Sequence, residues 1–179
     1  MKPIFLIGYM CSGKTTLGRA LEQVADVTYI DLDDMIVEEQ GMSVSEIFTA
    51  RGEDVFRSLE ADALARVARL ENVVVGCGGG TACNPANMEL MNGCGTTVLL
   101  EARRDRLLVR LLEGRARRPL IASLTDEEVE RAMERGLAQR KVHYERAANR
   151  FDSSLLETPD EVAGTVELFI KKFNLQRKI

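Results

Sequence analysis

Four short stretches of the chain are almost continuously apolar and rich in β-branched or aromatic residues. They cover residues 4–8, 27–31, 73–77 and 96–101, and a weaker fifth stretch covers 149–154. Such stretches are typical of strands in a parallel sheet that is covered on both faces, because these strands have no polar side. The pattern therefore predicts a five-stranded parallel sheet.

Longer segments with helical periodicity separate the predicted strands. Start signals support several of them: Ser43 and Thr125 each precede a glutamate at capping-box spacing, and Thr158 precedes a proline. The alternation of strand and helix predicts an α/β fold, a three-layer sandwich with right-handed crossovers. The predicted helices cover 14–25, 33–40, 44–71 with a break near Gly52, 85–92, 103–112, 126–148 and 159–174.

Composition narrows the class of protein. The 179 residues are 45% hydrophobic and 29% charged, which fits a single globular domain over residues 1–179. The net charge of −4 argues against a surface that coats nucleic acid. The four cysteines form no CxxC pair, and no apolar run reaches the length of a membrane span. We therefore expect a cytoplasmic protein with reduced thiols and with neither nucleic-acid nor membrane partners.

Residues 8–15, GYMCSGKT, follow the first predicted strand and fit the pattern GxxxxGK[ST] in full. The backbone N–H groups of such a loop surround phosphate oxygens, and the helix that follows adds its positive end. Lys14 is expected to reach the β- and γ-phosphates, and the Thr15 hydroxyl is expected to ligate Mg²⁺. The motif predicts binding of a nucleoside triphosphate and leaves the acceptor of the phosphate open.

Phosphate-transferring proteins often carry a metal-binding acid at the end of a neighbouring strand. The strand predicted at 73–77 ends instead in glycines, but the strand before it ends in VTYIDLDD. Ligands of open α/β sheets bind beyond the carboxyl ends of the strands, so this acidic cluster should face the phosphate loop. We assign Asp31 to the metal and Asp33 to the acceptor hydroxyl, with Asp34 as the candidate for a helix cap.

Several arginines lie where an anionic acceptor or the nucleotide needs them. Arg57 and Arg140 lie on predicted helices and are suited to hold a carboxylate in forked geometry. Arg115, Arg117 and Arg118 lie in a basic segment between two helices, which is suited to close over the nucleotide. Each of these arginines, taken alone, fits an ordinary surface position better than a ligand contact, and only as a set do they indicate a binding role.

The motifs together resemble the shikimate kinases, in order and spacing, over nearly the whole chain. The carrying segments are GYMCSGKTTLGR, YIDLDDMIVEEQGMSVSEIF, GEDVFRSLE, VVVGCGGGT, RARRPLI and QRKVHYERAA. The resemblance implies a P-loop fold like that of nucleoside monophosphate kinases, with an acceptor-binding segment at about 32–60 and a lid at about 112–124. It also implies transfer of the γ-phosphate of ATP to the 3-hydroxyl of shikimate by a monomer, on the route to aromatic amino acids.

The resemblance also implies roles for individual residues. The catalytic residues would be Lys14, Asp33 and Arg118, and Mg²⁺ would be held by Thr15 and Asp31. The nucleotide would contact Cys11, Ser12, Gly13, Lys14, Thr15, Thr16 and Arg118. Shikimate would contact Asp33, Arg57, Gly78, Gly79, Gly80 and Arg140.

The chain departs from the family pattern in three places, one of which is the absence of a proline shortly before Tyr144. The other two concern the nucleotide. Cys11 replaces a glycine that is common inside the family's phosphate loop, and SSLLETP after the last strand lacks the arginine that often packs on adenine.

Two other functions remain open at this point. The P-loop is equally compatible with a kinase for another hydroxylated acid, such as gluconate, although the paired Arg57 and Arg140 and the triple-glycine loop fit a compact ring acid better. A nucleotide-binding regulatory module that does not transfer phosphate would be expected to lack Lys14, Thr15, Asp31, Asp33 or the lid arginines, and all of them are present.

Overall fold

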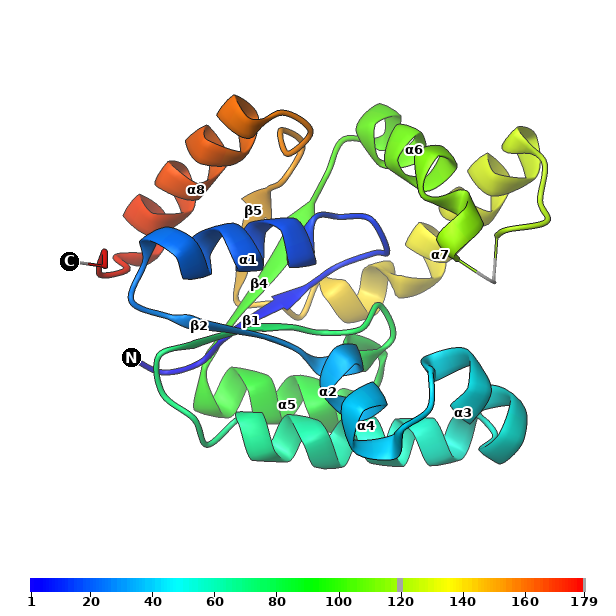
Figure 1. Ribbon diagram of the computed structural model, residues 1–179, viewed down its shortest axis with the longest axis horizontal. Coiled ribbons are helices and arrows are strands. Elements are labelled where there is room, and N and C mark those ends of the chain that lie inside the picture. The colour runs from blue at the N-terminus through cyan, green and yellow to red at the C-terminus, as the bar shows by residue number, and fades with distance from the viewer. Residues whose placement is uncertain (119–120, 179) are drawn as a thin grey trace.

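The computed structural model describes residues 1–118 and 121–178. Five strands form one parallel sheet in the order β2-β3-β1-β4-β5 (Figure 1). The strands are β1 (Ile4–Ile7), β2 (Thr28–Asp31), β3 (Val73–Gly76), β4 (Thr96–Glu101) and β5 (Asn149–Asp152). This confirms the predicted five-stranded parallel sheet, with each predicted strand present to within two residues at its ends.

Helices cover both faces of the sheet and complete the three predicted layers. On one face, α1 (Lys14–Val24) and α8 (Pro159–Phe173) pack on alternate residues of the strands, including Leu6, Val74 and Phe151 (Figure 1). The other face packs against α4 (Glu53–Val67), α5 (Pro85–Cys94) and α7 (Asp126–Tyr144). Because both faces are buried, the strands carry the continuous apolar runs seen in the sequence.

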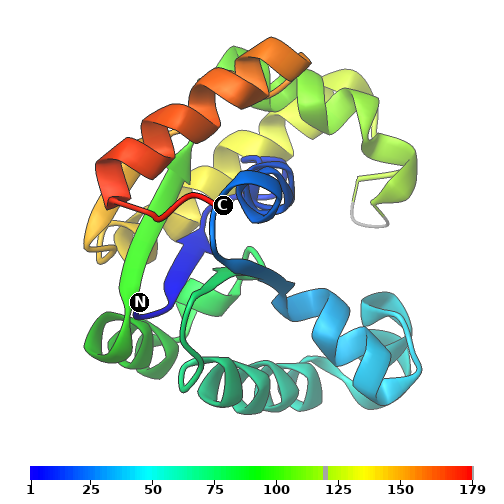
Figure 2. The same ribbon diagram turned by 60° about the vertical axis from the view of Figure 1, so that its left-hand side comes forward.

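Three further helices lie toward the carboxyl ends of the strands. These are α2 (Leu32–Gln40), α3 (Val44–Arg51) and α6 (Arg104–Glu113). In Figure 2, α2 and α3 lie on one side of these ends, and α6 lies on the other. Short 3₁₀ helices follow β3 (η1, Thr81–Cys83) and α6 (η2, Arg115–Arg117). The predicted lid at about 112–124 begins at the end of α6, and its residues 119–120 lie outside the described part of the chain.

The local signals for helix starts and ends agree closely with the structure. Ser43, Thr125 and Thr158 each cap a helix through a capping box. Gly52, with φ of 86°, separates α3 from α4, which is the break predicted in the segment 44–71. Two boundaries were wrong: α4 ends at Val67 and α7 ends at Tyr144, each four residues earlier than predicted. No helix in the described ranges is long and apolar enough to cross a membrane.

The strand order places β1 at the centre of the sheet, between β3 and β4. The connection after β1 leads to β2 on one side, and β4 and β5 extend the sheet on the other. A change of direction of this kind opens a crevice at the carboxyl ends of the strands, where ligands of α/β sheets bind. The phosphate loop follows β1 and therefore lies at this point.

Candidate active site

The phosphate loop is held in a strained conformation around the Lys14 side chain. Gly8 and Gly13 have φ of 146° and 97°, which L side chains rarely adopt, and Cys11 has φ of 64°. Lys14 Nζ donates hydrogen bonds to the carbonyls of Gly8 (2.8 Å) and Tyr9 (3.0 Å). Burial lowers the pKa of Lys14. The ammonium group is thus desolvated and ready to exchange two carbonyl partners for phosphate oxygens.

Cys11 lies at a phosphate-loop position where glycine is common, and the structure shows how cysteine fits there. Its left-handed backbone explains why a glycine suits this position, and its side chain is small enough to line the loop without blocking it. The Sγ atom lies 3.7 Å from the carbonyl oxygen of Arg110 on α6. Burial raises the pKa of the thiol, so Cys11 is neutral at physiological pH.

Two oxygen donors meet beside the phosphate loop. Thr15 Oγ1 donates to Asp31 Oδ2 at 3.2 Å, and Tyr29 Oη donates to the same carboxylate oxygen at 2.9 Å. The other oxygen of Asp31 accepts from the Asp33 backbone N–H at 3.2 Å and so caps α2. The expectation that Asp34 serves as the cap was wrong, since Asp34 lies on the exposed side near Arg19. A hydroxyl and one carboxylate suit Mg²⁺, which keeps several waters and uses few protein ligands.

Asp33 faces the carboxyl end of β3 and lacks a partner for one oxygen. Its Oδ1 atom is buried without a hydrogen bond among the described residues. Burial, followed by the charges of Asp31 and Glu60, raises the pKa of Asp33 to about 6 against the opposing effects of Lys14 and Arg57. A half-buried carboxylate with a pKa near neutrality and a free oxygen has the properties of a general base.

The acceptor side of the site is built on an ion pair that the sequence did not reveal. Arg57 Nη1 donates to Glu60 Oε2 at 3.0 Å, and its Nη2 donates to Glu53 at 3.0 Å. Glu60 is only 1% exposed and also accepts from the Thr81 hydroxyl at 2.6 Å. Because Glu60 is buried and doubly bonded, it fixes the guanidinium of Arg57 at the end of β3.

The glycines after β3 provide space for these side chains. A Cβ atom on Gly78 would lie 2.8 Å from Asp33 Oδ1, and one on Gly80 would lie 2.8 Å from Arg57 Nη2. A Cβ on Gly79 would meet nothing closer than 3.8 Å, so this residue borders open space next to the phosphate loop. The Tyr144 hydroxyl donates to the Gly79 carbonyl at 2.7 Å and holds the loop in place. None of the three has a positive φ, so bulk and not backbone conformation requires glycine here.

Arg140 approaches the same space from α7. Its guanidinium carbon lies 5.5 Å from the centroid of the Tyr9 ring, and its Nη1 donates to the Gly136 carbonyl at 3.2 Å. The structure therefore brings Arg140 beside the phosphate loop, as expected from the sequence. Arg118 follows η2 and donates to the carbonyl of Gly114 at 2.7 Å. Arg115 pairs with Asp126 at the start of α7.

A cavity of about 380 Å³ lies between the phosphate loop and α6. It is lined by Cys11, Gly13, Lys14, Thr15, Thr16, Arg110, Glu113, Gly114, Arg118, Leu156 and Glu157. Every predicted nucleotide contact except Ser12, which is buried beneath the loop, borders this space. Arg118 is one of the cationic side chains that line this cavity.

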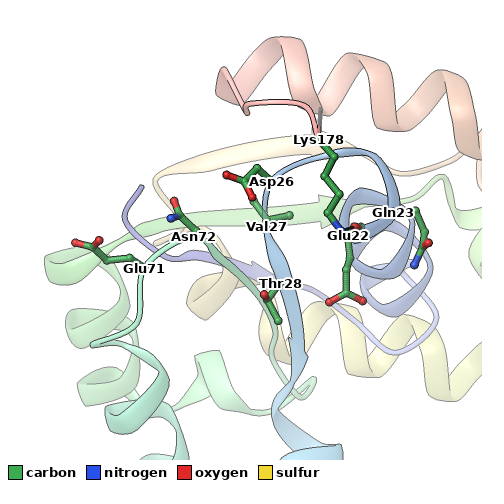
Figure 3. Close-up of a pocket in the computed structure, with 8 residues that line it drawn as sticks. All are labelled: Glu22, Gln23, Asp26, Val27, Thr28, Glu71, Asn72 and Lys178. Atoms are coloured by element: carbon green, nitrogen blue, oxygen red, sulfur yellow. Dashed lines mark hydrogen bonds between the residues drawn. The ribbon is translucent and has the colours of Figure 1, made fainter.

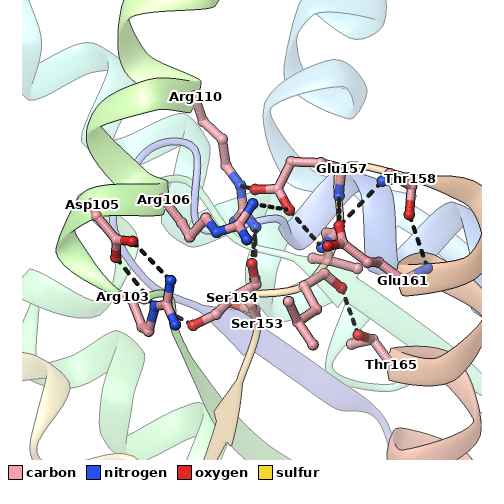
Figure 4. Close-up of polar contacts among 12 residues, drawn as sticks. Arg103, Asp105, Arg106, Arg110, Ser153, Ser154, Glu157, Thr158, Glu161 and Thr165 are labelled. Carbon is pink, nitrogen blue, oxygen red and sulfur yellow. Dashed lines mark hydrogen bonds and ion pairs between the residues drawn. The ribbon is translucent and has the colours of Figure 1, made fainter.

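Arg110 on α6 was not among the predicted site residues. It connects α6 to the phosphate loop and to the loop after β5, at the wall of this cavity. Its guanidinium donates to Glu157 (2.8 Å) and to the carbonyls of Ser153 (3.0 Å) and Ser154 (2.9 Å), as Figure 4 shows. It also donates to the Cys11 carbonyl at 3.4 Å. Arg110 therefore fixes the loop after β5 against the phosphate loop. The segment SSLLETP is thereby held from α6.

A second hollow, of about 390 Å³, lies at the amino ends of the strands (Figure 3). Its walls carry Glu22, Asp26 and Glu71, and Lys178 from the C-terminal segment closes one side. Within the described ranges, no group of three acidic, histidine or cysteine side chains is arranged to hold a metal ion. This hollow lies at the amino ends of the strands, whereas the phosphate loop lies at their carboxyl ends. It therefore takes no part in the site.

Comparison with known proteins agrees with this geometry. A sequence profile described as shikimate kinase matches residues 10–171. The chain belongs to the shikimate kinase family. A shikimate kinase from Phocaeicola vulgatus is 42% identical over 174 residues, which cover 97% of this chain and 99% of the relative. Family membership makes the chain a kinase and confirms the resemblance seen in the sequence.

Solved structures of shikimate kinases share the fold. The enzyme from Bacteroides thetaiotaomicron superposes with a TM-score of 0.91 at 39% identity, covering 97% of this chain and 99% of the other. A shikimate kinase from Acinetobacter baumannii, solved in complex with shikimate, has a TM-score of 0.78 at 25% identity. That pair covers 97% of this chain and 94% of the relative. These likenesses confirm the predicted P-loop kinase fold.

Proposed function

We propose that this protein transfers the γ-phosphate of ATP to the 3-hydroxyl of shikimate and releases shikimate 3-phosphate and ADP. The observation that carries the proposal is the position of Asp33. Its unpartnered carboxylate oxygen lies at the glycine loop, with the phosphate-loop lysine on one side and the Glu60-anchored Arg57 on the other. A hydroxylated acid that places its hydroxyl at Asp33 can therefore reach a guanidinium with its carboxylate.

The acceptor is held by its carboxylate and oriented by the glycine loop. Arg57 and Arg140 approach from different helices and offer the forked donors that carboxylates bind. The loop of Gly78, Gly79 and Gly80 lies opposite, and a compact ring can rest on the backbone of Gly79, between the side chains of Asp33 and Arg57. This arrangement favours a small cyclic acid over a flexible chain such as gluconate, because a rigid acceptor spans fixed donors at lower entropic cost.

Phosphoryl transfer then depends on positioning and charge. Lys14 exchanges its two carbonyl partners for phosphate oxygens, and Arg118 turns from the Gly114 carbonyl toward the transferring group. Asp33 accepts the hydrogen bond of the attacking hydroxyl and takes its proton as the bond to phosphorus forms. The leaving ADP stays in the cavity beside Cys11, Gly13 and Thr16.

Thr15 and Asp31 are the residues that would hold Mg²⁺. When bound there, the ion would neutralise phosphate charge next to Lys14. Tyr29 supports the proposal, because its hydroxyl bond to Asp31 fixes the carboxylate toward Thr15. All of these residues come from one chain, so we propose that the protein acts as a monomer. The free thiols of all four cysteines fit a cytoplasmic setting.

The test is a coupled assay of ADP release with Mg-ATP and a panel of acceptors. Shikimate should stimulate ADP release strongly, whereas gluconate and quinate should give a small fraction of that rate. The Arg57→Ala variant should raise the KM for shikimate far more than the KM for ATP. Absence of shikimate-dependent ADP release by the folded protein would refute the assignment.

A further inference from the structure

Tyr9 belongs to the phosphate loop by sequence, but its side chain packs away from the nucleotide cavity. The residue is 7% exposed, and its ring lies against α7. The Tyr9 hydroxyl donates to the Ala132 carbonyl of that helix at 3.4 Å. Its backbone carbonyl accepts the Lys14 ammonium. One residue thus contacts both the phosphate-binding lysine and the helix that carries Arg140.

Helix α7 is shaped to receive this ring. A Cβ atom on Gly136 would lie 2.5 Å from the Tyr9 hydroxyl oxygen and 2.7 Å from the ring carbon Cε2. Gly136 lies in the interior of a 19-residue helix, where glycine is unfavourable relative to alanine. Contact with Tyr9 explains why glycine occupies that position.

The same ring supports the guanidinium of Arg140. The guanidinium carbon lies 5.5 Å from the ring centroid, which is within the range of a cation–π contact. The described residues include no acidic partner for Arg140; its other contact is the Gly136 carbonyl one turn back. Arg57, by comparison, is held by two glutamates. Without the Tyr9 ring, Arg140 would have only one neutral anchor.

We propose that Tyr9 is a positioning residue for the acceptor: its ring holds the Arg140 guanidinium in the orientation that meets the acceptor carboxylate. The inference rests on the proposed function, which assigns that carboxylate to Arg57 and Arg140. An arginine without acidic partners has no carboxylate that competes with the ligand, and an aromatic face fixes its direction without competing for its donors. The phosphate loop thereby contributes to recognition of the acceptor through Arg140.

The test compares shikimate binding in variants at position 9. Tyr9→Phe keeps the ring and should keep the shikimate KM and calorimetric Kd within about twofold. Tyr9→Leu and Tyr9→Met remove the aromatic face and should raise both values by roughly 3- to 30-fold, while kcat and the KM for ATP change by less than about twofold. Two replacements are used so that a packing defect in one does not decide the outcome, and thermal unfolding verifies that each variant folds.

A double-mutant cycle with Arg140→Ala identifies the route of the effect. If Tyr9 acts through Arg140, Tyr9→Leu should change the shikimate Kd by less than about twofold in the Arg140→Ala background. An undiminished effect in that background would overturn the proposal, as would a loss in kcat at unchanged shikimate affinity. Phe173→Leu is the matched control, because Phe173 makes a similar contact with Lys172 on the opposite face of the sheet and should leave shikimate binding unchanged.

The two proposals fail in different ways. If the wild-type protein does not phosphorylate shikimate, the proposed function is wrong. If the wild-type protein does so, and Arg140→Ala weakens shikimate binding while Tyr9→Leu does not, only the role of Tyr9 is wrong.

Discussion

The raised pKa of Asp33 links the stability of the free protein to the carboxylate that we propose as the base. We consider the change Asp33→Asn, which keeps the size of the side chain and removes its charge. The pKa of Asp33 is raised from 3.8 to about 6, chiefly because burial disfavours the charged form. The folded state therefore holds the proton more tightly than the unfolded state does. The resulting stability is present in full below pH 3.8 and is lost as the pH rises through about 6.

The size of the effect follows from the two pKa values. Ionisation of Asp33 lowers the free energy of unfolding by about 3 kcal/mol at pH 8 and by about 1.5 kcal/mol at pH 5. The asparagine variant does not carry this pH-dependent penalty. Relative to wild type, it should gain about 1.5 kcal/mol more at pH 8 than at pH 5, on top of any difference that does not depend on pH. The same variant should lose shikimate-dependent ADP release by at least about 100-fold, because its side chain cannot take a proton.

The assay is urea unfolding of both proteins at pH 5, 6, 7 and 8 with EDTA present and nucleotide absent. Leaving out Mg²⁺ and ATP matters, because cations near Asp31 would also stabilise the charge on Asp33. Asp34→Asn is the control: that carboxylate is exposed, and its variant should show a much smaller change with pH. A stability difference between wild type and Asp33→Asn that is constant from pH 5 to 8 would refute the reasoning.

Three further variants test other parts of the site. Glu60→Gln removes the buried charge that anchors Arg57 and should raise the shikimate KM about tenfold with little change in the KM for ATP, as steady-state kinetics would show. Gly79→Ala should leave the melting temperature within about 2 °C, since its Cβ has room in the free protein, yet weaken shikimate binding at least about tenfold by calorimetry. Arg110→Ala should raise the KM for ATP about tenfold and leave shikimate binding to the free protein unchanged, because it frees the loop after β5. For each variant, weaker binding of only the substrate that is expected to be unaffected would contradict the assignment.

Much of the site was predictable because its parts are local in sequence or follow a rule of topology. The phosphate loop is one continuous motif that needs only a strand before it and a helix after it. Asp31 and Asp33 follow a strand directly, and parallel strands bring their carboxyl ends to one edge of the sheet. The glycines after β3 end the next strand of that sheet. None of these predictions required knowing which distant side chains touch.

The residues that sequence reasoning missed depend on contacts between distant segments. Glu60 lies one turn after Arg57 on an amphipathic helix, and nothing in the sequence distinguishes it from an exposed acid until Thr81 is seen to cover it. Arg110 lies on a helix with three arginines, and its role comes from carbonyls more than 40 residues later in the chain. The contact between Tyr9, which follows β1, and Gly136, which lies on α7, joins segments that are far apart in the sequence. A glycine inside a predicted helix was the available signal for that contact.

The absence of an acid at the end of β3 follows from the same packing. In the register of the sheet, Gly76 lies beside Asp31, and a Cβ atom on Gly76 would collide with the Tyr29 hydroxyl that holds Asp31. Two residues later, a Cβ on Gly78 would collide with Asp33. A carboxylate at either position would also add a charge next to acids that already raise the pKa of Asp33. The metal-binding acid therefore lies on β2, and moving it to β3 would require Tyr29, Asp33 and the acceptor loop to change together.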